Sequence, residues 1–209
     1  MRESEPVRVS PVPQDMLEIL MNGVFAFAMT LIVKNNIPFP SGSAVGDLDY
    51  FIRYLFGIFF DGVSFIFTFI VLAFFYLLVF EIMKRVYVLD RLFVYLDFGF
   101  MLAIVFIPVS SLLYSYSDMP VPYGILFHMN IILCGLILFC MWGYASGPGD
   151  LIQPAEGSHI RNLSLRIGAF FLTACIGFLF DSQEFLYGEI PLMVLYLIPI
   201  LVYIRYSEP

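Results

Sequence analysis

Residues 54–80 read YLFGIFFDGVSFIFTFIVLAFFYLLVF, and Asp61 is their only charged residue. A helix of about 20 mostly apolar residues crosses a bilayer core about 30 Å thick, so this run is long enough to span a membrane. The Asp61-Gly62 pair interrupts the run, which leaves the start of the transmembrane helix open. The run therefore indicates an integral membrane protein.

Five other stretches approach the same length. They are residues 16–34, 92–114, 121–142, 163–180 and 187–204. The uncharged cores of the first and the last are short, so bilayer thinning, helix packing or flanking side chains must absorb the mismatch. We predict an all-α, polytopic membrane fold with six transmembrane helices in each chain.

The composition of the whole chain agrees with a membrane domain. Of its 209 residues, 61% are hydrophobic and 13% are charged, whereas soluble domains average about 45–50% and about 25%. A net charge of −7 argues against a nucleic-acid partner, because no basic face exists to neutralise phosphates. The three cysteines lie in apolar runs without CxxC spacing, which argues against a disulfide framework or a zinc site.

The basic residues predict how the helices are oriented. If both tails and the even-numbered gaps share one side, only Lys34 and Arg53 fall opposite. The shared side then holds Arg2, Arg8, Lys84, Arg85, Arg91, Arg161, Arg166 and Arg205. The positive-inside rule places both termini in the cytoplasm, and we expect the cell (plasma) membrane as the location. The predicted organisation is a cytoplasmic tail at 1–14, a single six-span membrane domain at 15–205 and a C-terminal tail at 206–209.

Polar residues inside the apolar runs are few. No GxSxG or HExxH pattern occurs, so we expect no enzyme and no cofactor. His128 has no second His or Glu one turn away, which predicts a hydrogen-bonded core residue rather than a metal ligand. Three interpretations of Asp97 stay open: an ion pair with Arg91 or a neighbouring helix, a carboxylate at the membrane interface, or a carboxylate of a proton relay.

The first apolar run carries small residues on one helical face. Gly23, Ala26 or Phe27, and Thr30 follow the i, i+3, i+4, i+7 spacing of one face. A face of small residues allows another helix to approach closely. Two interpretations stay open, ordinary helix packing and the lining of an axis shared between subunits.

Several pieces of the sequence, taken in order, resemble a known family. Residues 22–31 (NGVFAFAMTL) are similar to the first helix of prokaryotic relatives of transmembrane protein 175, the endolysosomal potassium channel. The other similar pieces are residues 88–92, 95–97, 107–113 (IPVSSLL), 130 and 142–145 (WGYA). The resemblance covers about residues 15–145, and the last two spans agree only in hydropathy.

The resemblance implies a potassium channel that assembles as a homotetramer around its first helices, without a TVGYG-type filter. Phe27 and Leu31 match the apolar side chains of the pore constriction, which can gate by dewetting. Thr30 matches a hydroxyl position of the family, and Lys34 lies one turn beyond it. If Lys34 faces the axis, four ammonium groups repel cations; if it snorkels to the headgroups, it is an anchor. The implied partners are the bilayer, further copies of the chain and monovalent cations, with potassium as the permeant ion.

The sequence departs from the family at its polar hallmark. The hallmark is an Arg separated by three residues from Phe-Ser-Asp. In the first run of this chain, its positions are occupied by Met16, Leu20, Met21 and Asn22. A histidine pair late in the second helix, which contacts that hallmark, is replaced by Val79 and Phe80. Because removing only one side would strand a buried charge, the joint loss predicts an apolar replacement of the whole cluster.

Two other functions stay open at this point. One is a proton pathway or proton-coupled transporter that uses Asp97, Glu189 and His128. The other is a non-conducting membrane scaffold that retains the fold and lacks the polar cluster.

Overall fold

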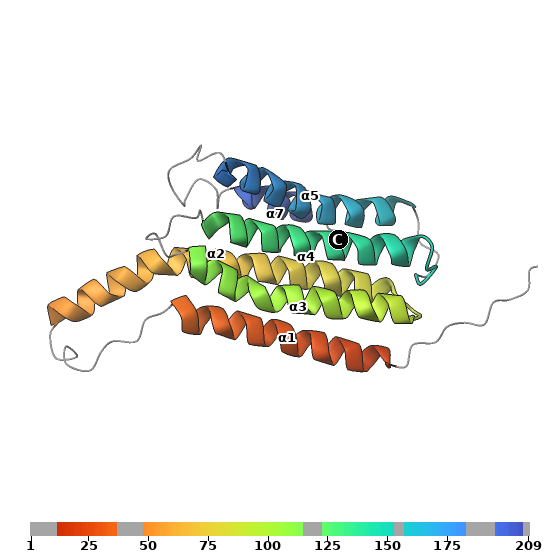
Figure 1. Cartoon of the computed structure of the whole chain (residues 1–209), viewed down its shortest axis with the longest axis horizontal. Coiled ribbons are helices and arrows are strands. Elements are labelled where there is room, and N and C mark those ends of the chain that lie inside the picture. Colours follow the sequence, from red (N-terminus) through yellow and green to blue (C-terminus); the bar gives the residue numbers. More distant parts are fainter. Residues whose placement is uncertain (1–11, 37–47, 115–122, 153–156, 183–194, 207–209) are drawn as a thin grey trace, which may run out of the picture.

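In a computed structural model, the chain is described for residues 12–36, 48–114, 123–152, 157–182 and 195–206. The helices are α1 (Gln14–Asn36), α2 (Leu48–Arg85), α3 (Arg91–Tyr114), α4 (Tyr123–Ser146), α5 (Gly157–Ser182) and α7 (Leu197–Tyr206). They lie side by side with their long axes roughly aligned, α1 at one edge of the bundle and α5 at the other (Figure 1). The described part therefore confirms the all-α class.

Five helices of the described part are long and apolar enough to cross a membrane. Their spans are Gln14–Val33, Ile66–Arg85, Arg91–Leu112, Ile125–Ser146 and Ile160–Phe180. The sixth predicted run, residues 187–204, is described only from residue 195, where α7 forms a ten-residue apolar helix. The count of six spans and the cytoplasmic position of both termini stay predictions.

Helix α2 corrects one expectation from the sequence. Its backbone is helical through Asp61 and Gly62, so the pair does not interrupt the helix. A glycine inside a helix costs only about 1 kcal/mol relative to alanine, which the long helix-compatible segments on both sides outweigh. Figure 1 shows the N-terminal part of α2 extending beyond the other helices, and the candidate span begins only at Ile66.

Buried aromatic rings fix the relative levels of the first three helices. The ring centroid of Phe100 on α3 lies 6.2 Å from that of Phe25 on α1 and 6.1 Å from that of Phe75 on α2. Ring pairs of this kind add about 0.5–1.5 kcal/mol beyond the burial of their area. Phe75 also contacts Phe170 of α5, with centroids 5.3 Å apart. The rings thus join four helices in one core.

Two polar contacts fix how α3 and α4 pair. Near one end of both helices, Tyr144 donates its hydroxyl hydrogen to Asp90, which also caps α3 by accepting from the Phe93 N–H at 2.8 Å. On α4, fourteen residues before Tyr144, Asn130 donates to the Ser110 hydroxyl at 3.3 Å. Because the two helices are antiparallel, residues between these contacts can be matched in level across the interface.

Candidate pore-lining face of α1

Helix α1 has one buried face and one exposed face. Its buried residues are Leu17, Met21, Phe25, Ala28 and Ile32, and α1 packs against α2 and α3. The exposed face carries Met16, Leu20, Gly23, Ala26, Phe27 and Thr30. The small residues expected on one face do share it, and no helix of the described part covers it.

The predicted constriction residues take two positions on α1. Phe27 is 55% exposed on the exposed face, whereas Leu31 is half-buried at its edge. The Thr30 hydroxyl donates to the Ala26 carbonyl oxygen at 2.7 Å, so its oxygen presents only lone pairs outward. The Lys34 side chain lies outside the described residues. The constriction itself stays a prediction.

The positions that match the family hallmark are split between the two faces. Met16 and Leu20 are exposed beside Phe27, whereas Met21 is fully buried against the bundle. On α2, Val79 is also fully buried and Phe80 is half-buried. The apolar replacement of the family's polar cluster therefore stays a prediction.

A contact between α1 and α2 shows that this replacement is incomplete. Tyr76 donates its hydroxyl hydrogen to Asn22 Oδ1 at 3.1 Å. The Tyr76 ring stacks on Phe80 with centroids 5.9 Å apart, and Lys84 Nζ lies 4.4 Å from the Phe80 centroid. A neutral polar contact therefore remains between the two helices. Sequence reasoning missed Tyr76 because it is one aromatic among many; its only signal is the i, i+4, i+8 spacing with Phe80 and Lys84.

Of the interpretations of Asp97 left open by the sequence, the ion pair is not found in the described part of the chain. The Asp97 side chain is 0% exposed, and neither carboxylate oxygen has a hydrogen-bond partner among the described residues. Arg91 is exposed. Six residues along a helix correspond to about 600°, so the two side chains leave α3 in different directions.

His128 confirms its predicted role as a hydrogen-bonded core residue. It is buried, and its Nδ1 lies 2.7 Å from the Tyr196 hydroxyl oxygen. Gly177 of α5 makes room for the ring, because a Cβ at this position would lie 2.5 Å from it. Among the residues that the structure describes, no three His, Cys, Asp or Glu side chains gather as a metal site.

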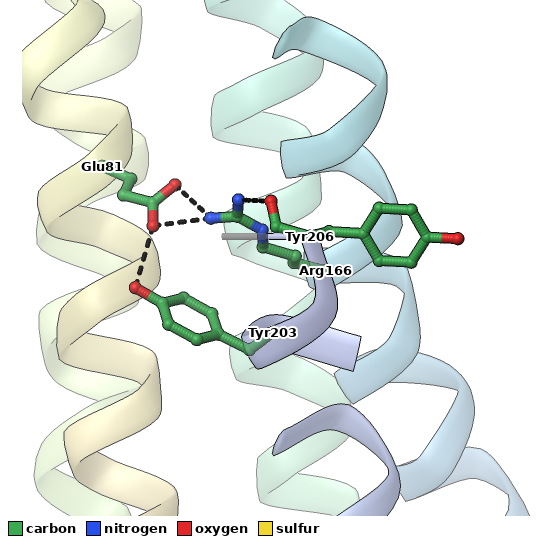
Figure 2. A network of polar contacts seen from close by, with 4 residues as sticks. All are labelled: Glu81, Arg166, Tyr203 and Tyr206. Carbon is green, nitrogen blue, oxygen red and sulfur yellow. Dashed lines mark hydrogen bonds and ion pairs between the residues drawn. The ribbon is translucent and has the colours of Figure 1, made fainter. Parts of the chain in front are cut away.

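A polar network between α2, α5 and α7 was not expected from the sequence. Figure 2 shows Arg166 pointing from α5 toward Glu81 on α2, with Nη1 2.7 Å from both carboxylate oxygens. Glu81 also accepts from the Tyr203 hydroxyl at 2.9 Å, and Arg166 Nη2 donates to the Tyr206 carbonyl oxygen. Arg166 had been counted only as a cation at the membrane surface, yet it is 3% exposed. The network fastens α7 to the bundle.

The described geometry can now be compared with known proteins. A family model described as "Endosomal/lysosomal potassium channel TMEM175" matches residues 16–108. The resemblance to the TMEM175 family is confirmed. The matched part includes the exposed face of α1, the Asn22–Tyr76 contact and Asp97. No curated protein sequence matches the chain.

A solved structure extends the TMEM175 likeness to the rest of the fold. The crystal structure of a lysosomal potassium-selective channel TMEM175 homolog from Chamaesiphon minutus is similar, with a TM-score of 0.72 and 16% identity. The match covers 93% of this chain and 98% of that chain. The last helices, which had agreed only in hydropathy, thus share the fold. The matched family is described as an ion channel, and the solved structure shows that the fold is shared.

Proposed function

We propose that the chain forms a potassium-selective or monovalent cation channel, with a pathway lined by the exposed face of α1 in a homotetramer. The observation that carries this proposal is the exposed face itself, on which Gly23, Ala26 and Thr30 lie beside Phe27. The larger side chains of Met16, Ile19 and Leu20 are exposed on the same helix. Exposed positions on α3, such as Leu102 and Phe106, are large and apolar, as lipid contact favours. Gly23 and Thr30 on α1 offer lipid little apolar surface and allow close helix packing instead.

The chemistry of this face suits a gated cation pathway. Four copies of Phe27, with Leu31 one turn further on, would form an apolar ring that blocks ions by excluding water. The Thr30 oxygen lies next to this ring with its lone pairs free, because its hydrogen bonds to the Ala26 carbonyl at 2.7 Å. A hydroxyl oxygen in this position would favour a cation that has passed the ring.

Potassium flux into liposomes tests the constriction. Phe27→Ala widens the apolar ring and is expected to raise the flux above that of the unaltered protein. Phe106→Ala is the matched control, because Phe27 and Phe106 are both 55% exposed and only the first lies on α1. Flux no higher than in empty vesicles, with Phe27→Ala equally silent, would refute the channel.

Native mass spectrometry tests the assembly separately. A Cβ at Gly23 would meet nothing within 4 Å, so Gly23→Leu leaves the packing within the chain intact. In a tetramer built on α1, the added side chain would hold neighbouring helices apart and reduce the tetramer population. Gly143→Leu on α4 is the control, since it is equally open within the chain. If the unaltered protein is a monomer or a dimer, the result would favour the non-conducting membrane scaffold over the tetrameric channel.

The proton pathway is the alternative because Asp97 is buried and its carboxylate has no hydrogen-bond partner in the described part of the chain. Of the other residues proposed for it, His128 is bonded to Tyr196 and Glu189 lies outside the described residues. A pH-gradient dye assay in liposomes separates the two functions. Proton flux that Asp97→Asn abolishes would support the alternative, and proton flux insensitive to it would count against it.

A further inference from the structure

Asp97 lies in the same layer of the bundle as the hallmark positions of α1 and α2. The Phe25–Phe100 and Phe75–Phe100 contacts place these three rings at one level. Helix α1 runs antiparallel to α2, as the Asn22–Tyr76 and Gln14–Met83 hydrogen bonds require. One helical turn from the level of these rings, toward the start of α3, lie Asp97 of α3, Met21 of α1 and Val79 of α2. All three side chains are fully buried.

The fourth side of this layer comes from α4. The Asp90–Tyr144 and Ser110–Asn130 hydrogen bonds bracket Asp97 along the antiparallel α3–α4 pair. Counting seven residues from the first contact leads to position 137 of α4, and counting thirteen from the second leads to position 143. Leu138 and Met141 lie between these positions, and both are 0% exposed. The buried side chains that the three helices packed against α3 carry at this level are apolar, whereas Asn22 is exposed there and accepts from Tyr76.

The charged and titratable groups of these helices lie at other levels or are engaged. On α1, Glu18 is one turn nearer the helix start and accepts from Gln14 at 3.2 Å. On α2, Glu81 is bonded to Arg166, whereas Lys84 and Arg85 are level with the start of α3. On α3 itself, Arg91 is exposed. On α4, Tyr144 is bonded to Asp90, His128 lies near the opposite end, and the Cys134 thiol is one turn from Leu138.

Among the residues that the structure describes, neither a donor nor a cation lies within bonding distance of the Asp97 carboxyl to stabilise its ionised form. A bound metal ion would need several protein ligands, and no group of them gathers among the described residues. A proton is the one ligand that neutralises a carboxylate without further partners. We infer that Asp97 is a proton-binding site, occupied at neutral pH, and that release of the proton places a negative charge directly behind the buried face of α1.

This site differs from a proton pathway, because the proton resides on one carboxyl and need not cross the membrane. On α1 the buried residue at this level is Met21, which lies about 120° around the helix from the exposed Phe27. A charge appearing at Asp97 would favour entry of water or movement of α1 away from α3. The occupancy of this site would therefore make the position of α1 sensitive to pH.

Infrared spectroscopy of the protein in lipid tests the proton directly. The unaltered protein at neutral pH is expected to show the C=O stretch of a protonated carboxylic acid, which decays as the pH is raised. Asp97→Asn should lose this band, and Glu18→Gln, which removes a partly buried carboxylate of α1, should keep it. Absence of the band from the unaltered protein, or its survival in Asp97→Asn, would overturn the assignment; the first outcome needs no variant to fold.

The link to α1 has its own readout. Cysteine accessibility at position 27, measured with a membrane-impermeant thiol reagent in the background of Phe27→Cys, should change with the pH at which the infrared band decays. Adding Asp97→Asn should abolish this change. The same pH dependence with and without Asp97→Asn would overturn the link. Neither measurement requires conduction, so a failure of the proposed channel would be distinguishable from a failure of this inference.

Discussion

Glu81 and Asp97 are two acidic residues at membrane level in one bundle, and their surroundings differ completely. Glu81 is 20% exposed and bonds to Arg166 and Tyr203. Asp97 is 0% exposed and, among the described residues, neither of its oxygens is bonded. Both interrupt otherwise apolar stretches of sequence. The difference shows that the helices packed around an acid, rather than its own position in an apolar run, decide whether a charge is stable there.

The partners of Glu81 come from distant parts of the chain. Arg166 is 85 positions away and Tyr203 is 122 positions away. The Arg166 guanidinium also lies 5.0 Å from the centroid of the Tyr203 ring, which adds a cation–π contact. The buried side chains at the level of Asp97 include Met21, Val79 and Met141, and none of them has a polar hydrogen to donate.

The largest expected effect comes from breaking the partnered site. Glu81→Ala should lower the free energy of unfolding by about 3–5 kcal/mol, because it leaves the Arg166 charge buried without its counter-ion. Denaturant unfolding in lipid–detergent micelles can be followed by the fluorescence of Trp142, the single tryptophan, which is buried and donates to Ser164 at 2.9 Å. The double variant Glu81→Leu with Arg166→Met should recover most of the loss. A loss as large in the double variant would contradict this account.

A smaller effect is expected from one hydrogen bond of the same network. Tyr203→Phe should cost about 1.5–3 kcal/mol, because the hydroxyl donates to a charged acceptor. The ring contact with Phe74, with centroids 5.3 Å apart, is retained. Tyr206→Phe is the control: Figure 2 shows its ring pointing away from the network, which uses only its carbonyl oxygen. Equal losses in both variants, measured by the same unfolding assay, would show that the hydroxyl bond is not responsible.

A neutral pair at the other side of α2 should contribute less again. Tyr76→Phe removes the hydrogen bond to Asn22 and should cost about 0.5–1.5 kcal/mol, as expected for two uncharged partners. Stacking on Phe80 is unaffected by the change. The same assay on Asn22→Ala and on the double variant gives the coupling energy. Strictly additive losses would mean that the two side chains do not interact.

The smallest effect is expected at Asp97. Asp97→Asn should change the free energy of unfolding at neutral pH by less than about 0.5 kcal/mol, because no partner is stranded and the amide resembles the neutral acid in shape. Leu102→Asn, exposed on α3, is a control for adding an amide to this helix. If Asp97→Asn is as costly as Glu81→Ala, Asp97 has a partner and the comparison between the two acids fails.

Local pattern was sufficient for much of the fold. Hydropathy located the five spans of the described part, since lipid selects apolar residues wherever a helix crosses it. Helical periodicity placed Gly23, Phe27 and Thr30 on one face, because that spacing depends only on the backbone. The pieces that resembled the TMEM175 family fall largely within the matched residues 16–108.

Pairwise contacts were beyond the reach of the sequence. The ion pair of Arg166 with Glu81, and the Asn22–Tyr76 bond, depend on how far each helix is rotated and shifted against its neighbours. Hydropathy determines neither the rotation nor the shift, because an apolar helix has the same mean hydropathy in every orientation. For the same reason the sequence left the surroundings of Asp97 open, and among the described residues its carboxylate oxygens have no hydrogen-bond partner.

The sequence by itself determined that this is an all-α membrane protein with the helix pattern of a potassium channel family and one small-residue face on α1. Only the tertiary structure decided which face of α1 stays uncovered, which buried charge is neutralised and which acid has no partner. The physical reason is one of range. Hydrophobicity and helical spacing act between neighbours in the chain, whereas charges and hydrogen bonds act between side chains that only folding brings together.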